Sequence, residues 1–206
     1  MSQKAHQFKK QEYTRNQILQ VSEDIISKEG IKGLSIRKIT NSLDYSPGII
    51  YHYFKNKNEI VETLVKEGYG KILSAINSTE KNEYEPQEEI KESFTNYIKA
   101  ALKSPEYYKA VMLSDDPSIL NKTRVLEKGI SEKSSAFKIL CENIERGMRK
   151  KHYRDLDIEL TAQVIWTSTF GLIIRLITEN DISKEQQERL IDNHFNILFN
   201  GILEKQ

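Results

Sequence analysis

GIKGLSIRKITNSLDYSPGIIYHYFKNKNEI, at residues 30–60, is the stretch of this sequence that decides the fold. Within it, apolar residues recur with the i, i+3, i+4, i+7 spacing of an amphipathic helix over residues 36–43, and Ser35 precedes them as an N-cap. A short connection then leads to Ser46, a second N-cap, with Pro47 at the first helical position, where its missing N–H costs nothing. The sequence therefore predicts two short helices joined by a tight turn, which describes a helix-turn-helix.

The second short helix has two different faces. Ile50 and Phe54 lie on one side of it, and we expect both in the core. The other side carries Pro47, Gly48, Tyr51 and His52. Asn56, followed three residues later by Glu59, has the spacing of a capping box and predicts the start of a long helix.

The quoted stretch resembles the N-terminal domain of the TetR family of bacterial transcriptional regulators. It has the family's pattern of a helix ending in glycine, a serine-capped third helix, a Tyr-x-x-Phe segment and a lysine before the fourth helix: Gly30, Ser46, Tyr51, Phe54 and Lys57. Asp44 stands in the turn where the family usually has glycine, and aspartate tolerates the left-handed backbone region better than most residues. The resemblance covers residues 12–65 and implies a ligand-responsive DNA-binding regulator, most often a repressor.

The resemblance also implies DNA-contacting positions at Ser35, Arg37, Pro47, Tyr51, Tyr53 and Lys57. Arg37 is the best base reader, because a guanidinium can bond guanine O6 and N7 together. The tyrosine hydroxyls and Lys57 suit phosphates. Pro47 and Ile49 suit thymine methyl groups, and Gly48 lets the backbone approach DNA closely. The predicted surface also includes four further residues: Ser46, Gly48, Ile49 and His52.

Helical periodicity continues through the rest of the chain, and no strand-like alternation is long enough to predict a strand. We expect further helices at residues 86–102, 105–113, 123–150, 157–179 and 183–203. The prediction is an all-α protein of about nine helices. Residues 1–65 are expected to form the three-helix helix-turn-helix DNA-binding domain, and residues 66–206 a helical-bundle ligand-binding and dimerisation domain.

Charge and composition favour the same class of protein. Residues 1–65 hold ten Lys and Arg against seven Asp and Glu, and the remainder holds 21 against 23, so the more basic end suits a polyanion. The sequence lacks metal-ligand histidine spacing, a nucleophile elbow, a P-loop and a dinucleotide fingerprint, so we expect no enzyme, metal or cofactor. No signal-peptide pattern is visible, and the apolar run at 164–177 is expected to be too short for a bilayer, which favours a cytoplasmic protein.

The second domain is expected to bind a small hydrophobic or aromatic effector. Aromatic and thioether side chains suit such a molecule, and we predict a cavity lined by Tyr97, Tyr107, Tyr108, Met112, Phe137, Cys141, Trp166 and Phe170. For the tyrosines and Met112, a place in the core is the alternative interpretation. Cys141 is either a buried small hydrophobe or a redox sensor.

The last two predicted helices are too apolar to be covered by one chain. With a second copy they are expected to form a four-helix bundle about a two-fold axis, as the resemblance also implies. The predicted interface consists of Ile173, Leu176, Ile191, Phe195, Leu198, Phe199 and Ile202. Such a homodimer would place two DNA-binding domains on the two half-sites of a palindromic operator.

Two alternatives stay open at this point. A helical ligand-binding or scaffold protein without sequence-specific DNA binding has the same periodicity, and salt-dependent DNA binding distinguishes the regulator from it. The basic residues near the N-terminus form either a solvated tail or an arm that touches phosphate: Lys4, Lys9, Lys10 and Arg15.

Overall fold

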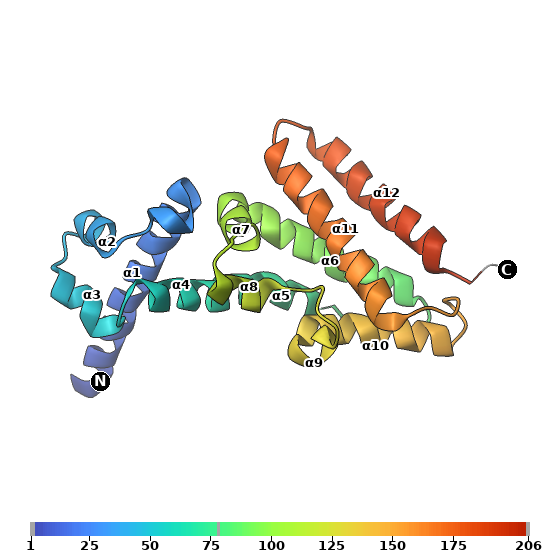
Figure 1. Ribbon diagram of the computed structural model, residues 1–206, viewed down its shortest axis with the longest axis horizontal. Helices are drawn as coiled ribbons and strands as arrows, with labels where there is room; N and C mark the ends of the chain where they lie inside the picture. The colour runs from blue at the N-terminus through green and yellow to red at the C-terminus, as the bar shows by residue number, and fades with distance from the viewer. Residues whose placement is uncertain (1–2, 78, 205–206) are drawn as a thin grey trace. The chain divides into compact units, whose positions relative to one another are not determined.

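The computed structural model describes residues 3–77 and 79–204, and every regular element within those two ranges is helical (Figure 1). Tyr153 and Leu203 form an isolated antiparallel bridge. The chain divides into two compact units: Met1–Gly70 with Pro105–Thr123, called the head unit here, and Lys71–Ser104 with Arg124–Gln206, called the body unit. The predicted functional boundary at residue 65 stays a prediction, because compactness alone does not assign function.

The head unit contains α1 (Gln3–Gly33), α2 (Ile36–Leu43), α3 (Pro47–Tyr53), α4 (Lys57–Leu64), the π-helical turn η1 (Val65–Tyr69), α7 (Pro105–Met112) and α8 (Pro117–Thr123). The backbone of α1 leaves helical geometry at Gly30, with φ at 72°, where the sequence predicted the helix to end. α2, α4 and α7 pack against α1. Fully buried aliphatic side chains from the first four helices form the core of this unit: Ile18, Ile26, Ile39, Ile50 and Ile60.

Tyr107 fixes the π-helical turn that follows α4. Its hydroxyl donates to the Leu64 carbonyl at 2.6 Å, at the residue where the helix widens. Gly68 makes room for this ring, since a Cβ at position 68 would lie 2.6 Å from the Tyr107 hydroxyl oxygen. Burial raises the pKa of Tyr107 far above that of an ordinary tyrosine, so the hydroxyl stays a donor. The turn is therefore specified by a pair of residues far apart in sequence.

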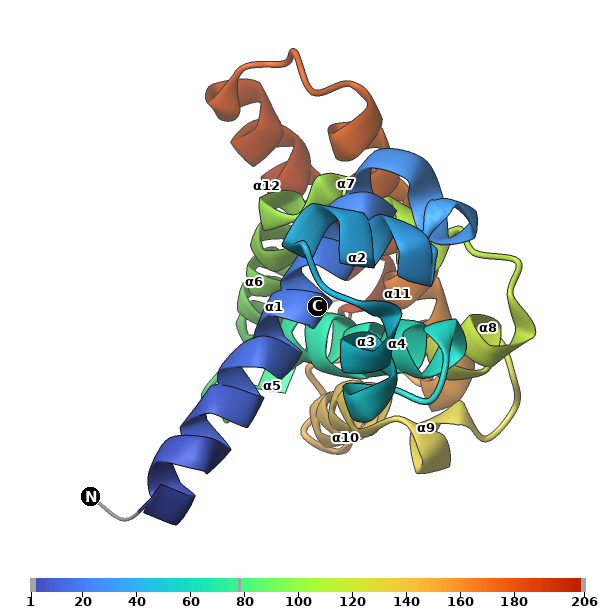
Figure 2. The same cartoon turned by 90° about the vertical axis from the view of Figure 1, so that its left-hand side faces the viewer.

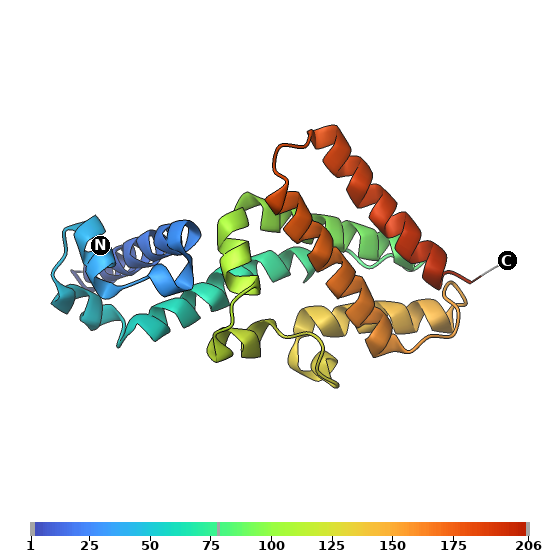
Figure 3. The same ribbon diagram turned by 45° about the horizontal axis from the view of Figure 1, so that its top comes forward.

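The body unit contains α5 (Gly70–Asn77, its first residue in the head unit), α6 (Pro86–Lys103), α9 (Ile130–Lys133), α10 (Ser135–Arg149), α11 (Ile158–Thr178) and α12 (Lys184–Ile202). α11 packs against α6, α10 and α12, and Figure 3 shows α11 and α12 as antiparallel neighbours. Trp166 lies at the centre, with its ring centroid 5.3 Å from that of Phe137 and 5.5 Å from that of Phe94. An aromatic core therefore joins α6, α10 and α11.

The single helix expected over residues 123–150 is wrong. The chain bends between Thr123 and Ile130, where Gly129 has a φ of 78°, and a further break follows α9. At that break the Ser134 hydroxyl oxygen accepts the Phe137 N–H at 3.4 Å and caps α10. Because of such breaks, the described residues hold more helices than the nine expected.

The apolar run at residues 164–177 lies within α11, which begins and ends close to the helix expected over residues 157–179. α11 extends over 21 residues and, by length and composition alone, is long and apolar enough to cross a bilayer. One such helix is weak evidence of a membrane span, because the core helix of a soluble protein has the same length and composition. In the structure the buried side of α11, which includes Trp166 and Ile173, packs into the body unit, as expected of the core helix of a helical bundle.

Candidate DNA-binding surface and effector site

The turn between α2 and α3 is closed by local hydrogen bonds. The Ser35 hydroxyl oxygen accepts the Lys38 N–H at 3.3 Å and caps α2. At the other end Asp44 adopts the left-handed conformation, with φ at 54° and ψ at 41°, as its sequence position predicted. The Tyr45 N–H then donates to the Thr40 carbonyl at 3.1 Å. These bonds fix the direction in which α3 leaves the turn.

α3 separates a buried side from an exposed one. Ile50 and Phe54 are buried, which confirms their expected place in the core. The structure brings the ten predicted DNA-contacting residues to α3, its turn and the starts of α2 and α4. Seven are exposed, namely Arg37, Ser46, Pro47, Gly48, Ile49, Tyr51 and His52; three are partly exposed, namely Ser35, Tyr53 and Lys57. The exposed side of α3 is free to enter a groove.

The cap of α3 differs from the other serine caps of this chain. The hydroxyl groups of Ser35, Ser134 and Ser183 accept backbone N–H groups, whereas Ser46 makes no side-chain capping bond. Its exposed hydroxyl therefore remains available to an external partner. The start of α4 is capped as predicted, because Asn56 Oδ1 accepts the Glu59 N–H at 3.0 Å.

The basic residues near the N-terminus fall into two groups. Arg15 pairs with Glu67 at 3.2 Å and lies 5.4 Å above the Phe54 ring centroid, so it belongs to the packing of the head unit. Lys9 and Lys10 are exposed on the first turns of α1. The side chain of Lys4 lies outside the described residues.

The eight predicted effector residues are divided between the two units. Tyr107, Tyr108 and Met112 lie on α7 in the head unit, whereas the other five lie in the body unit: Tyr97, Phe137, Cys141, Trp166 and Phe170. Within the body unit, Trp166 brings Tyr97 and Phe137 into one aromatic cluster. All three side chains are buried, and for Tyr97 a place in the core is the alternative that the sequence left open.

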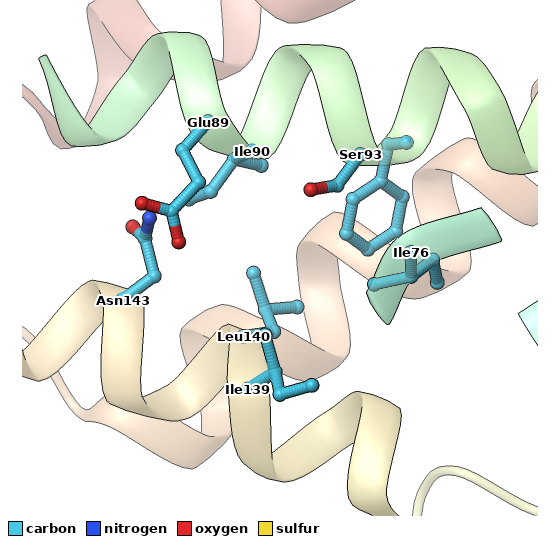
Figure 4. A pocket seen from close by; sticks show the side chains of 8 residues that line it. Ile76, Glu89, Ile90, Ser93, Ile139, Leu140 and Asn143 are labelled. Atoms are coloured by element: carbon cyan, nitrogen blue, oxygen red, sulfur yellow. The ribbon is translucent and has the colours of Figure 1, made fainter. Parts of the chain in front are cut away.

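A small cavity in the body unit lies beside this cluster. It measures about 10 Å³, room for about one water molecule, and Figure 4 shows side chains from α5, α6 and α10 around it. None of the predicted residues lines it; the lining consists of Ile76, Glu89, Ile90, Ser93, Phe94, Ile139, Leu140 and Asn143. Phe94 belongs to both the cavity wall and the aromatic cluster. The i, i+4 pairs 89/93 and 90/94 mark this inner face of α6, but periodicity alone did not distinguish it from core.

One end of the cavity is polar and held in place by hydrogen bonds. Glu89 forms a buried ion pair with Arg146 and also accepts the Asn82 N–H at 2.7 Å. Asn143 donates to the Pro86 carbonyl at 3.0 Å and accepts the Tyr153 hydroxyl at 3.2 Å. These bonds tie the start of α6 to the end of α10, so the polar end of the cavity is rigid.

Three buried donors in the body unit make no hydrogen bond among the described residues: the Thr79 hydroxyl, the Trp166 Nε1–H and the Arg146 Nε–H. A buried donor without a partner costs about 1–3 kcal/mol, so each calls for an explanation. Cys141 is half-buried, and burial raises the pKa of its thiol to about 11. Because the thiolate is the reactive form, this environment does not favour a redox sensor.

Most of the predicted dimer-interface residues are covered by their own chain. Leu198 is partly exposed, but the other six are buried: Ile173, Leu176, Ile191, Phe195, Phe199 and Ile202. They face inward because α12 packs on α11 and α6, which the apolar pattern alone did not reveal. The exposed apolar side chains of these two helices are Leu160, Val164, Leu190 and Ile197.

The capped two-helix turn and the exposed side of α3 define a helix-turn-helix DNA-binding protein. Residues 18–64 match the family described as bacterial regulatory proteins of the tetR family. This match lies within residues 12–65 and supports the DNA-binding transcriptional regulator that their resemblance implied.

Relatives of this chain extend over most of its length. It is 25% identical over 173 residues to the fatty acid metabolism regulator protein of Bacillus subtilis, covering 79% of this chain and 80% of the relative. It is 21% identical over 195 residues to the transcriptional repressor KstR2 of Mycolicibacterium smegmatis, covering 93% and 92%. A structure described as a tetR family transcription regulator from Shewanella sp. PV-4 has the same fold, with a TM-score of 0.72, 16% identity and coverage of 93% and 99%.

Proposed function

We propose that this regulator is a cytoplasmic repressor that holds a palindromic operator as a homodimer and releases it when a small apolar molecule binds the body unit. The observation that carries the proposal is the two-sided α3, with Ile50 and Phe54 buried and Gly48, Ile49 and Tyr51 presented outward. A helix presented in this way has the geometry of a recognition helix. The relative from M. smegmatis is named a repressor, which supports the direction of control.

DNA binding is tested with the full-length protein and a labelled fragment from the region upstream of its own gene. We expect binding to this fragment to be at least about a thousandfold tighter than binding to random DNA of the same length. The matched variant is Gly48→Glu, which puts a carboxylate on the exposed side of α3, where a Cβ meets only the Ser46 hydroxyl oxygen at 3.8 Å. Equal affinity for both DNAs would favour the alternative, a helical protein without sequence-specific binding.

The effector is proposed to be an apolar molecule that enters between α5, α6 and α10. The cavity there has room for about one water molecule, so binding must widen it, and a ligand that binds only the widened state shifts the protein toward that state. The relative from B. subtilis is named for fatty acid metabolism, which makes long-chain acyl compounds the first class to examine. Trp166 reports occupancy because its ring packs on Phe94 of the cavity wall.

The effector proposal is tested by titrating palmitate into the protein–operator complex. We expect quenching of Trp166 fluorescence and loss of operator binding over the same concentration range. Leu140→Phe narrows the cavity and should weaken both responses, while Leu126→Phe, at an exposed position of the same unit, should leave them unchanged. Palmitate binding without any loss of operator affinity would separate ligand binding from regulation and contradict the proposal.

The homodimer is proposed to form through the outer side of α11 and α12. The apolar residues on that side are well exposed, with Val164 at 59% and Ile197 at 65%. Gly171 and Gly201 have open space where a Cβ would be, which suits close approach of another helix. An exposed apolar stripe on two adjacent helices is the feature that a four-helix dimer interface needs.

A further inference from the structure

The first turns of α1 extend past the core of the head unit and are covered by no neighbouring helix (Figure 2). The earliest buried residue of α1 among those described is Ile18, and each side chain from Ala5 to Tyr13 is exposed. The core of this unit therefore does not need these turns. Their length and exposure call for a role other than packing.

A groove of about 480 Å³ lies between these turns and α3. Lys10 and Thr14 line it from α1, and Ser46, Gly48 and His52 line it from the other side. Gly48 and His52 belong to the exposed side of α3, and Ser46 precedes it as the N-cap. The groove is therefore continuous with the surface proposed to enter the major groove of the operator.

The charge of the groove suits a polyanion. Lys10 is its only lining cation and no acidic residue lines it, whereas the adjacent groove contains both Glu12 and Arg15. No carboxylate of the described residues forms an ion pair with Lys10, so its ammonium group is available. The Ser46 hydroxyl, which makes no capping bond, supplies a further donor on the opposite wall.

We infer that the first turns of α1 form a second DNA contact, in which the Lys10 ammonium group binds the sugar–phosphate backbone beside the major groove entered by α3. This inference rests on the proposed operator binding. A helix lying in the major groove is flanked by the phosphate backbone on both sides. Lys10 lies beside the exposed side of α3, so its ammonium group would contact phosphates rather than bases. The contact adds affinity and fixes register, and carries no base preference.

The test compares Lys10→Ala with Lys28→Ala, an exposed lysine on the same helix at a distance from the groove. Two labelled duplexes are used: the operator core alone, and the core extended by about one helical turn, roughly 10 bp, on each side. Lys10→Ala should bind the extended duplex several-fold more weakly than the parent. The slope of log affinity against log salt concentration should become less steep by about one for each bound protomer. Lys28→Ala should match the parent.

Ethylation interference locates the contact. In the parent, modified phosphates next to the major-groove half-site should block binding, and in Lys10→Ala this interference should disappear while the base preference stays unchanged. Parental salt dependence and parental interference in Lys10→Ala would overturn the inference. A parent that binds no operator would instead contradict the proposed function, so the two failures are distinguishable. Circular dichroism checks that the variants are folded.

Discussion

Arg37 and Lys57 are the two side chains whose proposed DNA roles differ most clearly: Arg37 is proposed to contact a base and Lys57 a phosphate. Arg37 is exposed at the start of α2, and Lys57 opens α4 partly exposed. Arg37→Ala should cost roughly 1–3 kcal/mol and relax the preference at one base per half-site, because a bidentate base contact is lost. Lys57→Ala should weaken binding to all sequences alike. Selection of bound duplexes with each variant measures these base preferences. Unchanged base preferences in Arg37→Ala would show that Arg37 does not contact a base.

Gly68 tests whether Tyr107 specifies the π-helical turn. Gly68→Ala places a Cβ 2.6 Å from the Tyr107 hydroxyl oxygen, so we expect a loss of about 1–3 kcal/mol in the free energy of unfolding. Gly70→Ala is the matched control, because its Cβ meets nothing within 4 Å. Urea unfolding measures both. Equal stability of the two variants would show that the turn accommodates the ring in another way.

Features that depend on neighbouring residues in the chain could be predicted from the sequence, whereas contacts between residues far apart in the chain could not. The caps at Ser35 and Asn56 and the left-handed Asp44 depend only on a few neighbouring positions, so the sequence alone indicated them. The contact between Tyr107 and Gly68 joins residues 39 positions apart, and no sequence pattern in either segment predicts it. The sequence left Tyr107 open between pocket lining and core, and the structure shows its hydroxyl donating to the Leu64 carbonyl.

At the scale of elements, α6 and α10 are joined by the buried pair of Glu89 and Arg146. Arg146→Met leaves the Glu89 carboxylate buried without its partner and should destabilise the protein by about 3–5 kcal/mol. The double variant Glu89→Leu with Arg146→Met should recover most of that loss, because no uncompensated charge remains. Thermal and urea unfolding provide the measurement. A single variant with parental stability would show that the pair does not hold these helices together.

A hydrogen bond between Thr169 of α11 and His194 of α12 joins these two helices, and the His194 imidazole can titrate. Thr169 donates to the Ile165 carbonyl at 2.8 Å, so its oxygen accepts from His194 Nε2 at 3.1 Å. Burial lowers the pKa of His194, so the folded state binds fewer protons than the unfolded state just below the ordinary value of 6.5. Stability should therefore fall as pH decreases below about 6.5. His194→Gln should flatten this dependence between pH 5 and 7.5 in urea unfolding; a parental slope in the variant would assign it to other groups.

The elements themselves were predictable where caps and periodicity agreed. α6, α7, α11 and α12 begin and end close to the expected residues, because prolines or capping side chains mark their starts. The break at Gly129 was missed because the apolar pattern continues across it. The inner face of α12 was missed for a different reason: periodicity identifies an apolar side but not which neighbour covers it.

For the whole molecule, the exposed stripe on α11 and α12 makes a specific prediction about assembly. Val164→Asp with Ile197→Asp puts charge on exposed positions, so the chain should fold and sediment as a monomer with much weaker operator binding. Leu126→Asp, equally exposed in the body unit, should stay dimeric. Aspartates at Phe195 and Phe199 would disrupt the core instead and could not test the interface. A folded Val164/Ile197 variant that remains dimeric would contradict the proposed interface.

The central claim is that α3 reads DNA from its exposed side in pairs related by two-fold symmetry. Selection of bound duplexes from a random-sequence pool by the full-length protein tests it most directly. The account predicts an enriched palindrome whose half-sites are separated by about one helical turn or somewhat more, and predicts that Gly48→Glu enriches nothing. Enrichment of no sequence by the parent, or the same palindrome recovered with Gly48→Glu, would contradict it.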